Sequence, residues 1–174
     1  MNRERLKSYL EVSTNLTVLI VAIILLSSFA INWFNNRSAR EVISGIAKGQ
    51  QLDANLNIDY RNSSYTLLLA LNTRCEHCAN NAKFYTEILH VTNNGKKVQA
   101  IAVFPNSLDE VRQYCQQHEL TMDHRDSVDL SLIRIAATPT LVLIDQTGRV
   151  VDFWVGEITG NNQQKLLSYL AALP

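Results

Sequence analysis

Residues 65–81 of the chain read YTLLLALNTRCEHCANN. The first seven positions, 65–71, form a short continuous apolar run, which is typical of a strand buried on both faces of a sheet. From Cys78 to Val91 the apolar residues recur at helical spacing instead. Cys75 is therefore predicted to lie between a buried strand and a helix, with Cys78 one turn further on. Two cysteines at this spacing can form a structural disulfide, half of a metal site or a working pair of thiols.

The rest of the chain continues the alternation of element types. Apolar runs and helical spacing predict three further strands and two further helices: strands over 98–104, 139–145 and 149–156, helices over 108–118 and 161–173. A turn at 145–148 joins the last two strands as a hairpin. Strands joined through a helix pair in parallel, whereas hairpin strands pair antiparallel. The predicted fold class is α/β, a mixed sheet with helices packed on both faces.

Length and composition limit the classes of function that the chain could have. A chain of 174 residues has room for one ordinary domain and an appendage. Its 16 lysines and arginines balance 16 aspartates and glutamates, so no overall field attracts nucleic acid, and we predict no nucleic-acid partner. Three cysteines are too few for a disulfide scaffold. Their role is therefore predicted to be chemical.

The N-terminal part of the chain contains one long apolar stretch, residues 16–34, which ends at Trp33 and Phe34. A helix over these 19 positions would be roughly 28 Å long, close to the hydrocarbon thickness of a bilayer. A buried core helix is one alternative. A cleaved signal peptide is another, because residues 28–30 offer small side chains at a cleavage position. We predict a retained single-pass membrane anchor that contacts lipid, since the apolar stretch continues past that position.

The chain is thus expected to have four parts: a short head (1–15), a transmembrane anchor (16–34), a mostly polar tether leading into the domain (35–58) and the α/β domain (59–174). Basic residues flank the anchor on both sides and give little bias to its orientation. A short head before a single span and a long domain after it favour export of the domain to the non-cytosolic side. Such a compartment permits disulfides.

The predicted place of Cys75 favours its thiolate, because the first N–H groups of a helix have no intrahelical partner and the helix dipole is positive there. The thiolate is the nucleophile, and Cys78 is placed to attack a mixed disulfide formed on Cys75. A protonated His77 would add to this stabilisation of the thiolate, while Glu76 would oppose it. The spacing leaves their net effect open.

The alternatives to redox chemistry need features that the chain supplies poorly. A zinc site needs four ligands, and the remaining candidates, Cys115 and three histidines (His90, His118 and His124), come from separate predicted elements. A purely structural disulfide between Cys75 and Cys78 closes so short a loop that it adds little stability. Redox work is favoured, without a cofactor or a bound metal. Cys115, on the apolar side of a helix, is interpreted as a core residue.

The cysteine pair after an apolar strand, the stretch ATPTLVLID with Thr138 and Pro139, and the stretch VVDFWVGE resemble the thioredoxin-like proteins. Within them the chain is similar to the membrane-tethered, exported thiol–disulfide oxidoreductases of the TlpA and ResA kind, the redoxin family. The resemblance runs from about residue 65 to 173. It implies that Pro139 is cis, that its loop lies against the cysteines, and that Thr138 and Pro139 shape the substrate groove.

The sequence also departs from the family pattern. Arg74 and Glu76 stand where tryptophan and proline are usual, and Leu69 stands six residues before Cys75, where many thioredoxins carry a buried acid. Histidine before the second cysteine, here His77, is similar to the pattern of strongly oxidising relatives. The direction of electron flow and the proton acceptor of the second cysteine therefore stay open.

We expect a membrane-anchored oxidoreductase that exchanges Cys75 and Cys78 with the thiols and disulfides of substrate proteins and of a further, unidentified redox partner. Arg74, Glu76 and His77 would tune the pair. One alternative is a copper(I) carrier, because soft thiolates suit that ion. A second is a peroxiredoxin-like peroxidase, but Thr73 lies two positions before Cys75, whereas that family's motif places its threonine three before.

Overall fold

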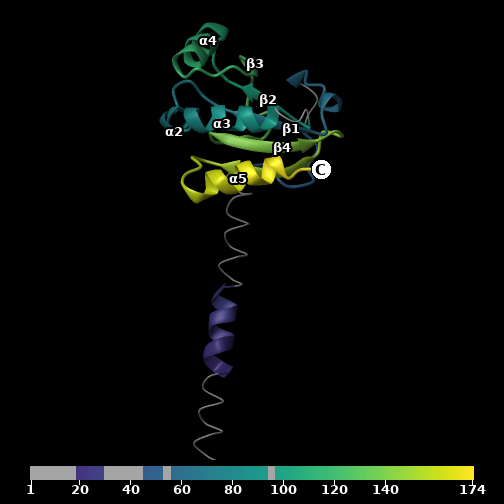
Figure 1. Cartoon of the computed structure of the whole chain (residues 1–174), viewed down its shortest axis with the longest axis vertical. Coiled ribbons are helices and arrows are strands. Elements are labelled where there is room, and N and C mark those ends of the chain that lie inside the picture. The colour runs from purple at the N-terminus through teal and green to yellow at the C-terminus, as the bar shows by residue number, and fades with distance from the viewer. Residues whose placement is uncertain (1–18, 30–44, 53–55, 94–96) are drawn as a thin grey trace, which may run out of the picture. The chain divides into compact units, whose positions relative to one another are not determined.

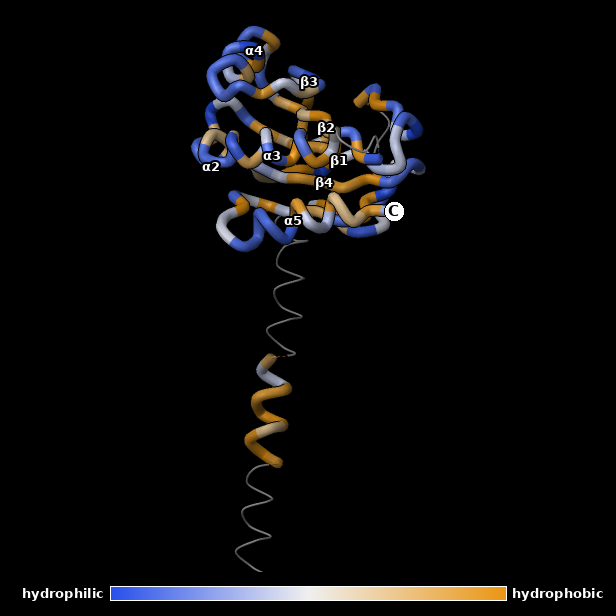
Figure 2. Tube along the Cα trace, viewed as in Figure 1, coloured by the Kyte–Doolittle hydropathy of each residue, from blue (hydrophilic) through white to orange (hydrophobic). Residues whose placement is uncertain are grey.

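The computed structural model describes residues 19–29, 45–52, 56–93 and 97–174. The chain divides into two compact units, residues 1–40 and 41–174. In the first unit, residues 19–29 form a helix with exposed apolar side chains, coloured as hydrophobic in Figure 2. The predicted head, 1–15, and both ends of the predicted anchor, 16–34, lie outside the described residues. Within the ranges that are described, no helix combines the length and apolarity that crossing a bilayer requires.

The second unit is built on a five-stranded mixed sheet with the strand order β3-β2-β1-β4-β5 (Figure 1). The strands are β1 (Tyr65–Ala70), β2 (Val98–Val103), β3 (Asp123–Arg125), β4 (Thr140–Asp145) and β5 (Val150–Val155). β1 pairs in parallel with β2, and β2 with β3. β4 pairs antiparallel with β1 on its other side, and β5 with β4. The predicted mixed α/β sheet is confirmed, including the parallel crossover and the antiparallel hairpin.

The helices differ in detail from the sequence pattern. The predicted helix over 78–91 is two helices, α2 (Glu76–Asn80) and α3 (Ala82–Asn93), which meet at Asn81. The helices α4 (Leu108–Gln117) and α5 (Asn161–Ala171) lie where the periodicity placed them. A short 3₁₀ helix, η2 (Tyr60–Asn62), precedes β1. The strand β3 was not predicted, because its three residues are polar and carry no apolar run.

The sheet separates two hydrophobic clusters. Alternation along β1 divides its side chains between them, with Leu67 and Leu69 in the first cluster and Leu68 and Ala70 in the second, all fully buried. This is the two-sided burial that the run YTLLLAL predicts. The first cluster contains the buried side chains of α3, α4 and α5, with α3 packed against α5.

The second cluster contains no α-helical residue in the described part of the chain, which differs from the expected helices on both faces. It is covered instead by the segments 45–52 and 128–135. Ile46 and Leu52 are buried in it. The Gly49 amide donates to the carbonyl of Val150 in β5 over 2.7 Å, and the Leu52 amide to that of Gly148 in the preceding turn over 2.9 Å. The expected tether, 35–58, is therefore packed onto the domain over its described residues.

The packing of this segment can be tested at Gly45, which has a φ of 66°. A Cβ there would lie 2.6 Å from the carbonyl oxygen of Arg134, so the backbone would have to shift. Gly49 also has a positive φ, 79°, but a Cβ there would meet nothing within 4 Å. Gly49→Ala should cost about 1 kcal/mol of unfolding free energy from the backbone conformation alone. Gly45→Ala should cost roughly 2–4 kcal/mol, because overpacking adds to the same backbone cost.

Urea unfolding of the two variants and the wild type measures this difference. Equal losses at the two glycines would contradict the close approach of residue 45 to the 128–135 segment.

Candidate active site

Cys75 occupies the N-cap of α2, with φ −91° and ψ 114°. Its carbonyl accepts hydrogen bonds from the amides of Cys78 and Ala79, both at 3.1 Å, which begins the helix. Its side chain makes no capping bond, so Sγ is left for other contacts. Helix α2 therefore begins at Glu76, two residues before the predicted start at Cys78, and Cys75 lies between strand and helix as predicted.

Two opposing effects set the acidity of Cys75. Partial burial raises its pKa, but hydrogen bonds from the side chains of Cys78 and Thr138 and from the amides of Cys78 and His77 lower it further than burial raises it. The net pKa of Cys75 lies below its ordinary value. The two amides belong to the first turn of α2, and that of Cys78 also donates to the Cys75 carbonyl. The thiolate predicted from the position of Cys75 is thus stabilised mainly by short-range donors.

Cys78 has the opposite environment. Its side chain is fully buried in the first cluster, whereas Cys75 is half-buried at the surface. Burial, opposed by the amide of Asn72 and reinforced by the neighbouring Cys75, raises the pKa of Cys78 to about 12. At neutral pH one sulfur is therefore disposed to ionise and the other to keep its proton.

The cis-proline loop lies beside the exposed sulfur. The Thr138–Pro139 peptide bond is cis, as the resemblance implies. The Sγ of Cys75 donates to the carbonyl of Thr138 over 3.3 Å, a bond that only the protonated thiol can make. Pro139 is buried at the start of β4, and Thr138 is half-buried. Residues 63 positions apart in the chain thus meet at one point.

A carboxylate that the sequence analysis did not assign contacts the residue between the cysteines. Nδ1 of His77 lies 2.8 Å from Oε2 of Glu157, and since a carboxylate can only accept, the imidazole nitrogen carries the proton in this contact. The His77 hydrogen bond holds the pKa of Glu157 below its usual range. The loop that carries Glu157 is fixed to the α2–α3 junction by the buried Asn81, whose side-chain oxygen accepts from the Ile158 amide at 2.9 Å.

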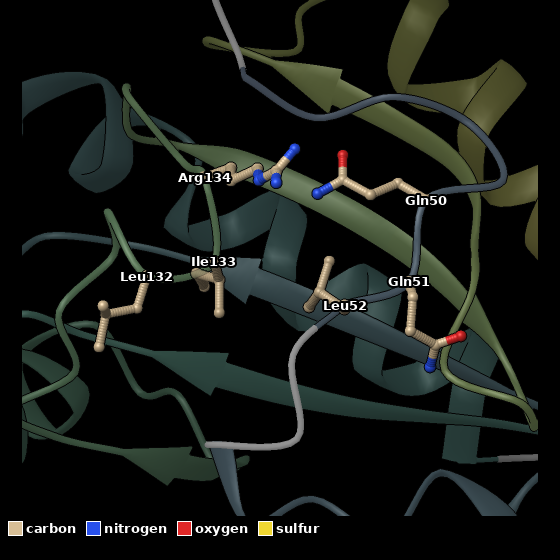
Figure 3. A pocket seen from close by; sticks show the side chains of 6 residues that line it. All are labelled: Gln50, Gln51, Leu52, Leu132, Ile133 and Arg134. Atoms are coloured by element: carbon tan, nitrogen blue, oxygen red, sulfur yellow. The ribbon is translucent and has the colours of Figure 1, made fainter.

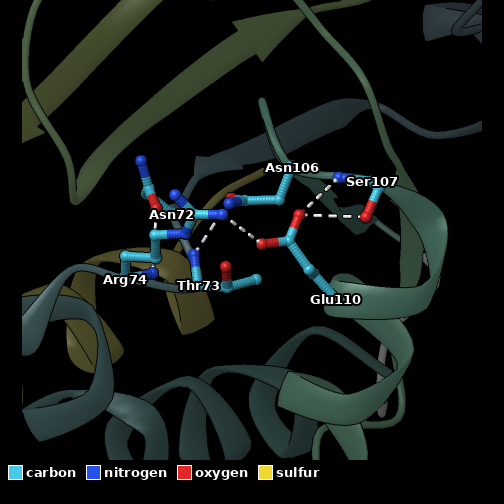
Figure 4. Close-up of polar contacts among 6 residues, drawn as sticks. All are labelled: Asn72, Thr73, Arg74, Asn106, Ser107 and Glu110. Carbon is cyan, nitrogen blue, oxygen red and sulfur yellow. Dashed lines mark hydrogen bonds and ion pairs between the residues drawn. The ribbon is translucent and has the colours of Figure 1, made fainter.

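A second polar network fixes the loop before Cys75 (Figure 4). The guanidinium of Arg74 pairs with Glu110 at 2.7 Å, and the same carboxylate accepts from the amide and hydroxyl of Ser107 at the N-terminus of α4. The amide of Thr73 donates to the side chain of Asn106 at 3.0 Å. Arg74 is mostly exposed, so its ion pair orients the loop more than it stabilises the domain.

Comparison with known proteins assigns the family. The thioredoxin-like domain family matches residues 58–171. The chain belongs to the thioredoxin-like family. No match to the chain is found among curated proteins.

Solved structures of low sequence identity share the fold of this thioredoxin-like domain. The thioredoxin domain of a thiol-disulfide oxidoreductase from Bacteroides vulgatus has a TM-score of 0.54 at 16% identity, with 72% of this chain and 99% of that chain covered. A thiol-disulfide oxidoreductase from Bacteroides fragilis has a TM-score of 0.53 at 17% identity, covering 64% and 84%. A secreted disulfide oxidoreductase from Mycobacterium tuberculosis has a TM-score of 0.51 at 15% identity, covering 65% and 84%.

The thioredoxin-like structure brings some of the predicted site residues together and leaves others apart. Arg74, Cys75, His77 and Thr138 have contacts around the cysteine pair or its loop, as described above. Glu76 is exposed, and its side chain has no hydrogen bond or ion pair among the described residues. Glu157 was missed because a single acidic residue after a strand has no distinguishing pattern, although it lies in the VVDFWVGE stretch.

The residues considered for a metal site do not form one. No group of three or more potential metal-ligating side chains gathers anywhere in the described ranges. Cys115 packs half-buried against the first cluster, as its apolar position suggested, and burial raises its pKa. His90 and His118 line an open surface pocket, without Cys115 or His124. No third or fourth ligand for the pair is therefore found among the residues that the structure describes.

A separate pocket of about 270 Å³ lies between residues 50–52 and 132–134 (Figure 3). The side chains of Gln50 and Arg134 point into the same space, and Leu52 and Ile133 lie on its inner side. Its lining includes none of the residues around the cysteine pair. The candidate site of this thioredoxin-like domain, at the half-buried Cys75, is accordingly separate from this pocket.

The acidity of Cys75 gives a direct test of the site. In a Cys115→Ala background, the rate of alkylation of Cys75 should fall as the pH falls through a midpoint below about 8.5, the value for free cysteine. Cys78→Ala removes one donor to the thiolate and should move this midpoint upward, whereas Cys78→Ser keeps a donor and should move it less. Rates of iodoacetamide labelling between pH 5 and 10 measure all three. An ordinary midpoint in the Cys115→Ala protein, or equal midpoints in the two Cys78 variants, would contradict this account.

Proposed function

We propose that the protein is a thiol–disulfide oxidoreductase that acts on the disulfides and thiols of substrate proteins through Cys75 and Cys78. The observation that carries the proposal is the asymmetry of the pair: Cys75 is half-exposed with a lowered pKa, and Cys78 is fully buried with a pKa of about 12. A nucleophile needs exposure and ionisation, while a resolving thiol needs protection until its target is formed. The family and the fold shared with oxidoreductases support the same function.

The exchange proceeds in two steps. The Cys75 thiolate attacks one sulfur of a substrate disulfide, forms a mixed disulfide with it and releases the other substrate sulfur as a thiolate. Cys78 then attacks the Cys75 sulfur, so the Cys75–Cys78 bond forms and the bond to the substrate breaks. Two electrons pass from the protein's dithiol to the substrate's disulfide. The reverse sequence oxidises a substrate dithiol, with the same residues in the same roles.

The cis-proline loop gives a reason why the first step would be specific for extended protein chains. Cys75 Sγ is 3.3 Å from the Thr138 carbonyl, so a chain bound at Cys75 would run beside the Thr138 backbone. A main-chain segment can pair there with hydrogen bonds that do not depend on its sequence. When the thiol ionises, its bond to that carbonyl is lost and the carbonyl becomes free to accept from a substrate amide. Thr138 and Pro139 are therefore proposed to shape the groove.

Residues 74, 76 and 77 are proposed to tune the pair rather than to react. Glu157 neutralises the charge of a protonated His77, which weakens the stabilisation that this imidazole could give to Cys75. The guanidinium of Arg74 is held in an ion pair with Glu110. The charged side chains nearest the cysteines in sequence are thus arranged as a His77–Glu157 pair, an Arg74–Glu110 pair and the exposed Glu76.

The cellular setting is proposed from the sequence. Residues 16–34 would anchor the chain in a membrane with the domain on the non-cytosolic side. There the pair would meet protein disulfides and a further redox partner that restores its own state.

The function can be tested with three single substitutions in the full chain. Cys78→Ala should trap mixed disulfides on Cys75, because the second step is lost, and these should disappear on reduction with dithiothreitol. Cys75→Ala should trap none and should lose more than about 100-fold of the insulin-reducing activity. Cys115→Ala is the matched control and should keep both properties of the wild type.

Redox equilibration with graded glutathione mixtures completes the test. The wild type should interconvert between dithiol and Cys75–Cys78 disulfide. A pair that neither forms nor opens its bond, or a Cys75→Ala variant with wild-type activity, would refute the function.

A further inference from the structure

The resolving step requires a negative charge to form on Cys78 inside the core of the thioredoxin-like domain. Cys78 must give up its proton to attack, yet it is fully buried and burial raises its pKa. Leu69, six residues before Cys75, is also fully buried in the same cluster and offers no polar group. The buried polar side chains of the described residues are all uncharged: Thr66, Asn81, Thr92, Asn106 and Thr140. Within the described ranges, no buried carboxylate or amine is present to assist Cys78.

Two tyrosines in the first cluster have buried hydroxyls without a hydrogen-bond partner in the described part of the chain, Tyr85 and Tyr114. Tyr85 is fully buried and Tyr114 is 4% exposed. Both belong to the cluster that contains Cys78. Buried hydroxyls are normally hydrogen-bonded, so an unpaired one requires an explanation.

The helix geometry directs Tyr85 toward Cys78. The two residues are seven positions apart, about two helical turns, and so lie on one face. Helical bonding continues through the α2–α3 junction, because the Asn81 amide donates back to the His77 carbonyl at 3.3 Å and the Tyr85 amide to the Asn81 carbonyl at 3.0 Å. Helical side chains lean toward the N-terminus, which brings the Tyr85 ring back along the helix in the direction of Cys78.

Tyr114 comes to the cluster from α4 and is fixed by its neighbours. Its ring meets Phe104 edge-on with centroids 5.8 Å apart and lies 4.5 Å from the ring of His118. These contacts hold the ring between the end of β2 and the last turn of α4. Tyr114 therefore enters the first cluster, which contains Cys78, from a different element than Tyr85 does.

The electrostatics connect both hydroxyls to the buried sulfur. Burial, and next to it the negative charge of a Cys78 thiolate, raise the pKa of both Tyr85 and Tyr114. The other groups that act on Tyr85 are Tyr114, Cys75 and Glu157, and those that act on Tyr114 are Cys75 and Cys115. Both phenols stay protonated and can only donate to a neighbouring anion.

We propose that the hydroxyls of Tyr85 and Tyr114 donate hydrogen bonds to Sγ of Cys78 as it ionises, and so stabilise the thiolate of the resolving step in a core that has no buried charged group among its described residues. The proposal rests on the proposed function and names residues that act on its second step. A hydrogen bond to the charged form of a group favours that form. The two phenols would thus lower the cost of making a thiolate in the core.

The step balances without an added reagent. Cys78 Sγ forms its bond to Cys75 Sγ, the bond between Cys75 and the substrate breaks, and the substrate sulfur leaves with the electron pair of that bond. The proton that Cys78 releases passes to the leaving sulfur of an aliphatic substrate, or to solvent when the leaving group is a weakly basic aromatic thiolate. Each phenol keeps its own proton throughout and acts only as a donor.

The test separates the two chemical steps in the full chain. A chromogenic aromatic disulfide releases one coloured thiolate when Cys75 attacks and a second when Cys78 resolves, so stopped-flow absorbance gives both rate constants. Tyr85→Phe and Tyr114→Phe should each slow resolution about tenfold, as the loss of one hydrogen bond to a charged group predicts. The attack rate should change less than about twofold, since the donors to Cys75 remain. The pH midpoint of the resolving step should rise in both variants.

Tyr60→Phe is the matched control, because Tyr60 also has a buried hydroxyl without a partner among the described residues, but packs against the second cluster. Burial alone raises the pKa of Tyr60, with no contribution from a cysteine. Its variant should resolve at the wild-type rate. All three substitutions relieve an unpaired hydroxyl, so each should leave the free energy of unfolding unchanged or raise it.

Each outcome either supports or overturns the proposed role of the two tyrosines. Wild-type resolution in both Tyr85→Phe and Tyr114→Phe, or equal slowing of attack and resolution, would overturn the proposal while leaving the oxidoreductase function standing. A wild type that releases neither coloured thiolate would overturn the function itself. If one variant fails to fold, the other decides alone, because each tyrosine comes from a different element.

Discussion

The site depends on the contrast between two sulfurs: that of Cys75 at the N-cap of α2 and that of Cys78 one turn further along the helix. Cys75 caps α2 with its backbone and leaves its side chain near first-turn amides, while Cys78 points into the core between the helices. The same turn of helix that joins them separates their environments. One sulfur is consequently acidic and half-exposed, and the other is neutral and protected. An exchange reaction in two ordered steps follows from this contrast.

Three sets of contacts with distant parts of the chain fix the position of the cysteine pair. Thr138 brings the cis-proline loop to the exposed sulfur. Asn81 and Glu157 fix the loop after β5 to the helix that carries the pair. Arg74 and Glu110 fix the loop before Cys75 to α4. The lowered pKa of Cys75 therefore depends on the folded turn of the motif, through Cys78 and the His77 amide, and on Thr138 from a distant part of the chain.

The sequence was sufficient where local pattern and tertiary packing agree. The strand at 65–71 could be predicted because every position faces one of two cores, and the hairpin because a turn signal separates two apolar runs. The split of the active-site helix could not be predicted, because Asn81, where the two helices meet, accepts a hydrogen bond from the distant amide of Ile158. β3 exists only through its ladder with β2. Likewise, helical periodicity marks Tyr85 as a core residue but does not show that its hydroxyl lacks a partner.

The ordering of the two sulfurs can be measured directly in the unmodified protein. The fully reduced chain is treated at neutral pH with less than one equivalent of iodoacetamide, and the labelled cysteine is identified by peptide mass analysis. The account predicts that nearly all the label is on Cys75, because burial raises the pKa of both Cys78 and Cys115. Equal labelling of Cys75 and Cys78, or preferential labelling of Cys115, would contradict it.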